Sequence, residues 1–249
     1  MIQNPESNWF GYKSVRPEDK TGMVHDVFDS VYDKYDLMND VMSGGIHRLW
    51  KDRFISEIRP KQGKTYLDVA GGTGDIAFRI RKKTGSDARI IVCDLTENML
   101  RTGRDRAIDK GWTDLEWVTG NAENLPIPDE SIDVYTIAFG LRNVTHIDFA
   151  LKEAFRVLKK GGMFFCLEFS SVQNPLLARA YNVYSDQVIP KMGEIIAKDR
   201  DSYEYLVESI RKFPAQKELT ERIRNAGFTR VSFSNLTLGI AAIHKGFKT

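Results

Sequence analysis

The sequence feature that most limits the fold is the stretch YLDVAGGTGDIAFRI, residues 66–80. An apolar run, a glycine-rich turn and a helix-forming run in this order are typical of a buried strand that leads through a tight loop into a helix. Glycine has no side chain, so such a loop lets a ligand approach the backbone closely. The stretch therefore predicts an α/β fold with a nucleotide-type pocket beside this strand.

The following residues continue the same alternation. Apolar strand patterns and amphipathic helix patterns succeed each other over residues 65–169. Strands separated by helices of this length indicate a parallel sheet covered on both faces. Two further strand patterns, RVSFSNLTLG and IAAIHKGF, close the chain and are joined through Gly239. They are too close for a parallel crossover, so we expect them to be antiparallel.

The pattern also predicts how the chain is divided. Residues 1–22 are polar and rich in turn-forming residues, which indicates a flexible or draped arm. We expect one domain over residues 23–249, because 249 residues with 42% hydrophobic composition can bury one large core. Two additions are expected within it: helices ahead of the first central strand (23–60) and a helical lid or substrate insertion (171–215).

Composition excludes several classes of protein. The 36 basic and 34 acidic residues are spread along the chain, so no basic tract indicates nucleic-acid binding. Cys93 and Cys166 lack metal-ligand spacing, and we expect no metal site and two reduced core cysteines. No apolar run reaches the ~18 residues of a membrane span, and the first ten residues lack a secretion-signal pattern. These features predict a cytoplasmic protein.

The glycine turn is compatible with a dinucleotide. GTGDIA fits the pattern G-x-G-x-x-A, and Asp94 follows Gly74 by twenty residues, at the end of the second strand, where an acid binds ribose hydroxyls. This favours an NAD-dependent oxidoreductase. Asp75 argues against it, because a carboxylate at the start of the helix would repel a pyrophosphate.

S-adenosylmethionine fits the same turn better. It carries ribose without phosphate, and its sulfonium and ammonium are cations. Asp68, Asp75 and Asp94 would place three carboxylates around it. The plainer alternative is that Asp75 only caps the helix and that Asp68 is a strand-edge residue.

The loop also carries a resemblance to a known fold family. DVAGGTGD resembles the first motif of class I methyltransferases, with Ala70 in place of its first glycine and with Gly72 and Gly74 retained. The resemblance implies a Rossmann-like, seven-stranded sheet whose last strand is antiparallel. It also implies S-adenosylmethionine as the cofactor.

Longer segments resemble a narrower family. KYDLMNDVMSGGIHRLWKDRF, TIAFGLRNVTHID, LEFS and DSYEYLVESIRKFP are similar to the ubiquinone and menaquinone biosynthesis C-methyltransferases, and the similarity runs from about residue 22 to the end. It implies C-methylation of a polyprenyl quinol, namely 2-methoxy-6-polyprenyl-1,4-benzoquinol or demethylmenaquinol. It also implies cofactor contacts at Thr73, at Asp94 and at Asn121 with Ala122. A serine that some relatives use as a contact is Ala138 in this chain.

Arg142 and Asn143 are the first-choice catalytic pair, because they follow the fourth strand at the carboxyl edge of the sheet. A cation there would stabilise a phenolate and so activate the ring carbon. Alternatively, Arg142 forms an ion pair with an acid of the lid. Tyr35 is a candidate to close over the ring, or else is a core aromatic. His146 could act as a base, but it sits where a helix begins.

The insertion bears on partners and location. Apolar residues mixed with charge between 176 and 196 suit a lid or a surface that touches a membrane, or else packing on the core or on a second subunit. The resemblance implies a homodimer, a quinone-biosynthesis complex, and a peripheral place on the inner membrane, in the mitochondrial matrix for a eukaryotic mature form. Other small-molecule or RNA methyltransferases and a non-enzymatic scaffold remain alternatives.

Overall fold

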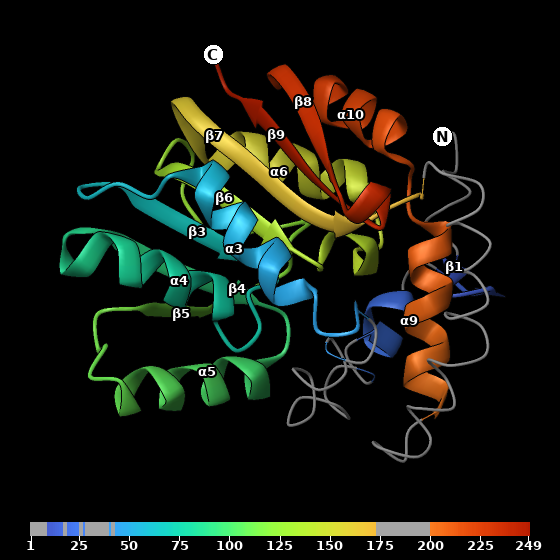
Figure 1. Cartoon of the computed structure of the whole chain (residues 1–249), viewed down its shortest axis with the longest axis horizontal. Coiled ribbons are helices and arrows are strands. Elements are labelled where there is room, and N and C mark those ends of the chain that lie inside the picture. Colours follow the sequence, from blue (N-terminus) through green and yellow to red (C-terminus); the bar gives the residue numbers. More distant parts are fainter. Residues whose placement is uncertain (1–8, 17–18, 25–26, 28–39, 41–42, 173–199) are drawn as a thin grey trace.

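The protein is built around one seven-stranded sheet with the strand order β5-β4-β3-β6-β7-β9-β8. Its computed structural model describes residues 9–16, 19–24, 27, 40, 43–172 and 200–249. Strands β5 and β8 form the two edges (Figure 1). The strands are β3 (Thr65–Val69), β4 (Arg89–Asp94), β5 (Glu116–Thr119), β6 (Ile132–Ala138), β7 (Leu158–Phe169), β8 (Thr229–Leu236) and β9 (Ala241–Phe247).

Strand direction confirms the predicted fold class. Strands β3 to β7 pair in parallel, whereas β9 runs antiparallel to both of its neighbours, β7 and β8. Strand β9 therefore lies between β7 and β8, as the class I methyltransferase fold requires. Strand β7 begins at Leu158, ahead of the predicted MFFCLEF segment, because its pairing with β6 continues through a register shift between Ile132 and Val134.

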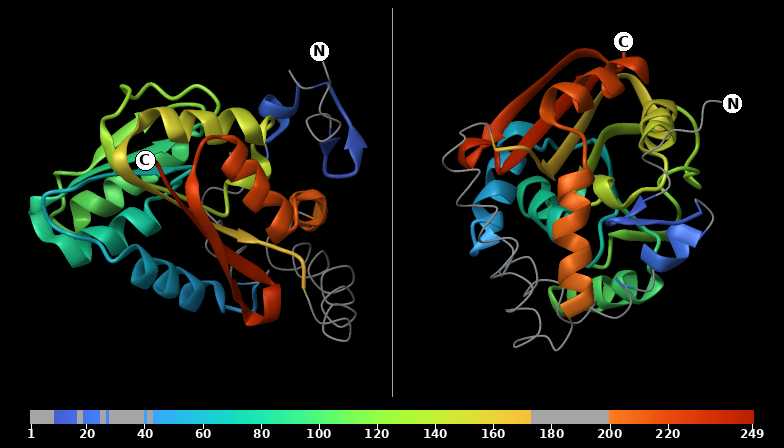
Figure 2. Two further views of the ribbon diagram at one scale, coloured as in Figure 1. Left: turned by 90° about the horizontal axis from the view of Figure 1, so that it is seen from above. Right: turned by 90° about the vertical axis from the view of Figure 1, so that its right-hand side faces the viewer.

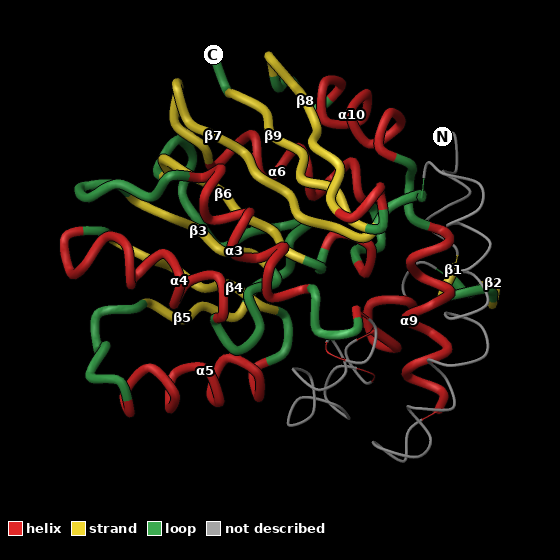
Figure 3. The backbone as a smooth tube through the Cα atoms, in the orientation of Figure 1, coloured by secondary structure: helices red, strands yellow, loops and turns green. Residues whose placement is uncertain are grey.

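Helices cover both faces of the sheet, so the molecule has three layers (Figure 2; Figure 3). Side chains of β4 alternate between two cores: Ile90 and Val92 belong to one, Ile91 and Cys93 to the other. This burial on both faces explains why the strand has no polar alternation in the sequence. The first core includes residues of α3 (His47–Ile58), α4 (Asp75–Thr84) and α5 (Glu97–Asp109), and the second includes residues of α6 (Ile147–Val157) and α10 (Gln216–Asn225).

Both predicted core cysteines are buried free thiols: Cys93 lies in β4 and Cys166 in β7. Within the part of the chain that the structure describes, three short 3-10 helices join the larger elements. They are η2 (Gly85–Asp87), η3 (Leu141–Asn143) and η6 (Thr237–Gly239). Helix η3 follows β6 directly, at the carboxyl ends of the parallel strands.

The arm and the insertion meet beside this end of the sheet. In the arm, β1 (Trp9–Phe10) and β2 (Lys13–Ser14) form a small antiparallel hairpin, and α9 (Arg200–Lys212) belongs to the insertion. The ring of Phe10 stacks on Tyr205 of α9 at a centroid distance of 4.2 Å. The backbone amide of Tyr12 donates to Glu208 at 2.9 Å. This part of the arm therefore drapes over α9 (Figure 1).

The remaining part of the predicted lid, residues 173–199, lies outside the described residues. Of the helices that the structure does describe, none combines the length and the apolar character needed to cross a bilayer.

Candidate functional site

The loop between β3 and α4 forms one wall of a pocket at the carboxyl end of the sheet. Gly74 precedes α4 with φ of 84°, and a Cβ there would lie 2.8 Å from Trp117 Cη2. Only glycine therefore fits this position without strain. Ala70, which replaces the usual first glycine of the motif, adopts φ of 50°. A Cβ on Gly140 would lie 2.3 Å from Ala70 Cβ, so Gly140 provides the space for this alanine.

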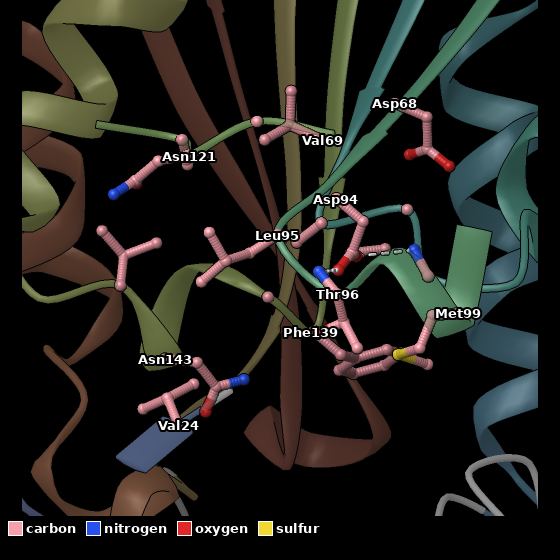
Figure 4. A pocket seen from close by; sticks show the side chains of 18 of the residues that line it. Val24, Asp68, Val69, Asp94, Leu95, Thr96, Met99, Asn121, Phe139 and Asn143 are labelled. Carbon is pink, nitrogen blue, oxygen red and sulfur yellow. Dashed lines mark hydrogen bonds between the residues drawn. The ribbon is translucent and has the colours of Figure 1, made fainter. Parts of the chain in front are cut away.

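Asp94 ends β4 and joins the loop to the next helix. Its Oδ2 accepts a hydrogen bond from the Gly72 amide at 2.8 Å, and its Oδ1 accepts one from the Thr96 amide at 2.9 Å (Figure 4). The carboxylate is thereby fixed in orientation at the edge of the pocket. Its predicted role toward the ribose remains a prediction.

Asp68 is a buried acid with one open oxygen. Its Oδ1 accepts a hydrogen bond from Thr136 Oγ1 at 2.8 Å, whereas Oδ2 has no hydrogen-bond partner among the described residues. Burial raises the pKa of Asp68 to about 7; the Thr136 hydrogen bond opposes this shift and the negative charge of Asp75 adds to it. Because an unpaired buried oxygen is costly, this atom is suited to a cationic or hydrogen-bonding ligand group.

Asp75 is paired with two cations, so it is not the unpaired carboxylate that the sequence led us to expect beside the ligand. Its Oδ2 lies 2.7 Å from Lys51 Nζ, and its Oδ1 lies 2.9 Å from Arg79 Nε. Burial alone would raise the pKa of Asp75, but these two cations outweigh burial and hold that pKa below its usual value. Asp75 therefore joins α4 to α3 in addition to lining the pocket.

The pocket brings most of the predicted cofactor residues together. Gly74 shapes the loop but does not line the pocket, and Tyr35 lies outside the described residues. The described residues contain no cluster of three or more potential metal ligands. The predicted residues that line the pocket are Asp68, Gly72, Thr73, Asp75, Asp94, Asn121, Ala122 and Asn143.

Several lining residues were missed in the sequence, among them Lys51, Met99, Glu123 and Phe139. Met99 could have been found from its place one turn into the helix after Asp94. Lys51 and Phe139 had no comparable signal, because they reach the pocket only through the packing of α3 and the turn after β6.

Glu123 lines the pocket and fixes the turn that leads into α6. Its Oε1 accepts hydrogen bonds from the backbone amides of Thr145 and His146, at 3.0 and 3.1 Å. Its Oε2 lies 2.7 Å from His146 Nδ1. His146 immediately precedes α6, as the sequence indicated, but makes no side-chain capping bond there. This histidine is held by Glu123 and does not line the pocket.

Arg142 is fully buried beside the pocket and does not line it. Its Nη1 lies 3.0 Å from Glu168 Oε1, also donates to the Phe139 carbonyl, and its guanidinium sits 5.5 Å from the Phe169 ring centroid. Arg142 therefore forms the ion pair that the sequence offered as the alternative to a catalytic role. Its partner, Glu168, lies on β7 and not on the lid.

Arg142 lines a second, smaller cavity, which Tyr205 also lines and which shares Val144 and Thr145 with the first pocket. Its Nε and Nη2 have no hydrogen-bond partner among the described residues. Asn143, the other predicted catalytic residue, lines the first pocket and accepts a hydrogen bond from the Tyr205 hydroxyl at 3.2 Å. The two candidates therefore border two adjoining cavities.

Comparison with protein families identifies the chain. The model described as the ubiE/COQ5 methyltransferase family matches residues 14–248. The chain belongs to the ubiE/COQ5 methyltransferase family. This membership confirms the resemblance stated above, the enzyme class and S-adenosylmethionine as the methyl donor, and it excludes the NAD-dependent oxidoreductase.

Relatives in the ubiE/COQ5 family cover almost the whole chain. A protein of Dictyostelium discoideum named 2-methoxy-6-polyprenyl-1,4-benzoquinol methylase, mitochondrial, is 50% identical, covering 99% of this chain and 88% of its own. The ubiquinone/menaquinone biosynthesis C-methyltransferase of Brucella abortus (strain S19) is 55% identical over 96% of this chain and 90% of its own. A solved structure of a phosphoethanolamine N-methyltransferase from Haemonchus contortus, in complex with S-adenosylhomocysteine, superposes with a TM-score of 0.67 at 13% identity, covering 90% and 60% of the two chains, and shows likeness of fold.

The residues of the pocket fit the cofactor of this family. Asp94 is held by two backbone amides, Asp68 offers an open buried oxygen, and the glycine loop leaves the backbone accessible. Leu95, Met99 and Phe139 add apolar surface for a flat base. The pocket thus combines the acidic and apolar groups that a cationic nucleoside needs.

Proposed function

We propose that this chain transfers the methyl group of S-adenosylmethionine to a ring carbon of a polyprenyl benzoquinol. The observation that carries the proposal is the near full-length similarity, at 50 and 55% identity, to relatives named for quinol C-methylation. Demethylmenaquinol is the second substrate, since the Brucella relative is named for both ubiquinone and menaquinone biosynthesis.

The test is an assay of the purified protein with both quinols under reducing conditions. We expect S-adenosylhomocysteine to form in equal amounts with a product one methyl group heavier, whose label from methyl-labelled donor lies on the ring. Cofactor binding without turnover of either quinol would favour a scaffold. Methylation of RNA or of an unrelated phenol alone would favour the other methyltransferase alternatives.

Arg142 is the proposed electrostatic catalyst. The bound cofactor supplies an electrophilic methyl group, and the quinol carbon attacks it most readily when the neighbouring phenol loses its proton. Arginine is a poor base but a strong hydrogen-bond donor to a phenolate. Two of its guanidinium nitrogens have no partner among the described residues, which leaves donors for that oxygen. We propose that Asn143 orients the ring from the adjoining pocket and that Tyr35 covers it.

Arg142→Lys tests this role, because lysine keeps the positive charge but loses the planar fork. We expect the turnover number to fall at least ~100-fold, similar to the loss of one oxyanion donor, while cofactor affinity is retained. Single-turnover kinetics and equilibrium dialysis measure the two effects separately. Arg222→Lys is the matched control, since Arg222 lines the same second cavity and pairs with Glu218. Normal turnover in Arg142→Lys would remove the catalytic role, and loss of folding would leave only the ion pair with Glu168.

The proposed setting follows from the substrate. A polyprenyl quinol resides in a membrane, so we propose peripheral contact with that membrane, assembly as a homodimer and association with other enzymes of quinone synthesis. For a eukaryotic chain the proposed compartment is the mitochondrial matrix, since the Dictyostelium relative is named as mitochondrial. Vesicle flotation and light scattering test the contact and the dimer.

A further inference from the structure

Lys51 brings a positive charge into the cofactor pocket from outside the strand–loop–helix unit. It lies on α3, its side chain is 6% exposed, and it lines the pocket beside the glycine loop. Among the described residues that line this pocket, Lys51 is the one with a cationic side chain. A lysine ammonium is strongly hydrated, so burying it requires compensation.

Asp75 gives only part of this compensation. The Lys51 ammonium has three N–H donors, and among the described residues its hydrogen bond goes to Asp75 Oδ2. The Asp75 carboxylate is shared with Arg79. Asp52, which also pairs with Arg79, has a side chain that is 67% exposed, so water screens its charge. Positive charge and unused N–H donors therefore remain at this edge of the pocket.

The amino-acid end of S-adenosylmethionine has a complementary arrangement of charges. It carries one carboxylate and one ammonium on the same carbon. Asp68 and Lys51 both line the pocket: Asp68, whose buried Oδ2 has no partner among the described residues, can accept from the ammonium, and Lys51 can donate to the carboxylate. We propose that Lys51 binds the carboxylate of the cofactor and that Asp75 positions Lys51 for this contact. The proposal rests on the cofactor of the proposed function and names a residue that recognises it.

The test compares two ligands that differ only in this carboxylate: S-adenosylhomocysteine and S-adenosyl-3-thiopropylamine, its decarboxylated analogue. Isothermal titration calorimetry gives the ratio of their dissociation constants. Hydrogen bonds to charged groups predict that the parent binds S-adenosylhomocysteine at least ~10-fold more tightly than the analogue. In Lys51→Met we expect this ratio to approach one, through weaker binding of S-adenosylhomocysteine alone.

Arg79→Met is the matched control, because it removes the other cation that pairs with Asp75 but does not line the pocket. Its ratio should equal that of the parent, even if both affinities change. If Lys51→Met does not fold, Lys51→Gln replaces it: the neutral amide removes the charge but keeps a polar group for Asp75, so the ratio should again approach one.

An unchanged ratio in Lys51→Met, or in Lys51→Gln where that variant is used, would overturn the role of Lys51 while leaving the cofactor assignment intact. Failure of the parent to bind either ligand would instead overturn the proposed function and this inference together. Equal weakening of both ligands in Lys51→Met would mean that Lys51 only supports the loop.

Discussion

Asp68 shows how one residue couples the pocket to pH. Its ordinary pKa is 3.8, and burial raises the pKa to about 7 in the folded chain. Between these values the folded state binds more protons than the unfolded state, so its contribution to stability falls as pH rises from about 4 to 7.

We therefore expect Asp68→Asn to remove this contribution, which amounts to at most about 1.4 kcal/mol per pH unit. The free energy of unfolding, measured by urea denaturation at pH 5 and pH 7, should fall less with pH in this variant than in the parent. Asp109→Asn, a change at an exposed residue of α5, is the control and should leave the slope unaltered. Identical slopes in Asp68→Asn and the parent would show that the carboxyl is ionised throughout.

At the scale of elements, one buried ion pair joins η3 to β7. Arg142 and Glu168 have side chains that are 0% and 1% exposed, and burial raises the pKa of Glu168 despite the arginine beside it. Removing one partner of such a pair leaves the other charge buried without compensation.

We expect Glu168→Gln to lower the free energy of unfolding by about 3–5 kcal/mol, the range for breaking a buried ion pair. Glu116→Gln is the matched control, because Glu116 pairs with Arg89 across β4 and β5 with both side chains about half exposed. Exposed pairs contribute about 0–1 kcal/mol, so this variant should be nearly neutral. Equal effects of the two changes would mean that the Glu168 environment is far more hydrated than its burial indicates.

At the scale of the whole molecule, α3 connects the N-terminal part of the chain to the sheet and to the pocket. Phe54 is fully buried and meets Phe165 of β7 edge-to-face at a centroid distance of 6.3 Å. Lys51, one turn earlier, reaches the pocket from the same helix. A substitution that disturbs the packing of α3 on the sheet should therefore also change the shape of the pocket.

Phe54→Ala is expected to cost about 3–5 kcal/mol of stability, as for other buried phenylalanines. It should also weaken S-adenosylhomocysteine binding, because Lys51 loses its support. Leu49→Ala on the same helix removes a side chain from a residue that is 67% exposed, so its cost should stay within about 0.5 kcal/mol. Denaturation and calorimetry on both variants provide the comparison. Unaltered binding in a folded Phe54→Ala variant would show that α3 and the pocket are independent.

The sequence by itself determined the order of strands and helices, the antiparallel final pair and the glycine loop with Asp94 at the next strand end. These features depend on periodicity and on glycine geometry, which act over a few neighbouring residues. Parallel strands also end at one edge of the sheet, so the sequence could place Asp68 and Asn143 at a common pocket, whereas Asn121 was indicated only by the resemblance to the family.

Only the tertiary structure decided how the charges are paired. Lys51 meets Asp75 across two helices, and Arg142 meets Glu168 across a 3-10 helix and a strand. Neither pair has a periodic spacing, because the distance between such groups depends on how separate elements pack. An acid that looked free in the sequence is therefore compensated in the fold. Asp68, which the sequence offered as a cofactor contact or else as a strand-edge residue, has one oxygen without a partner among the described residues.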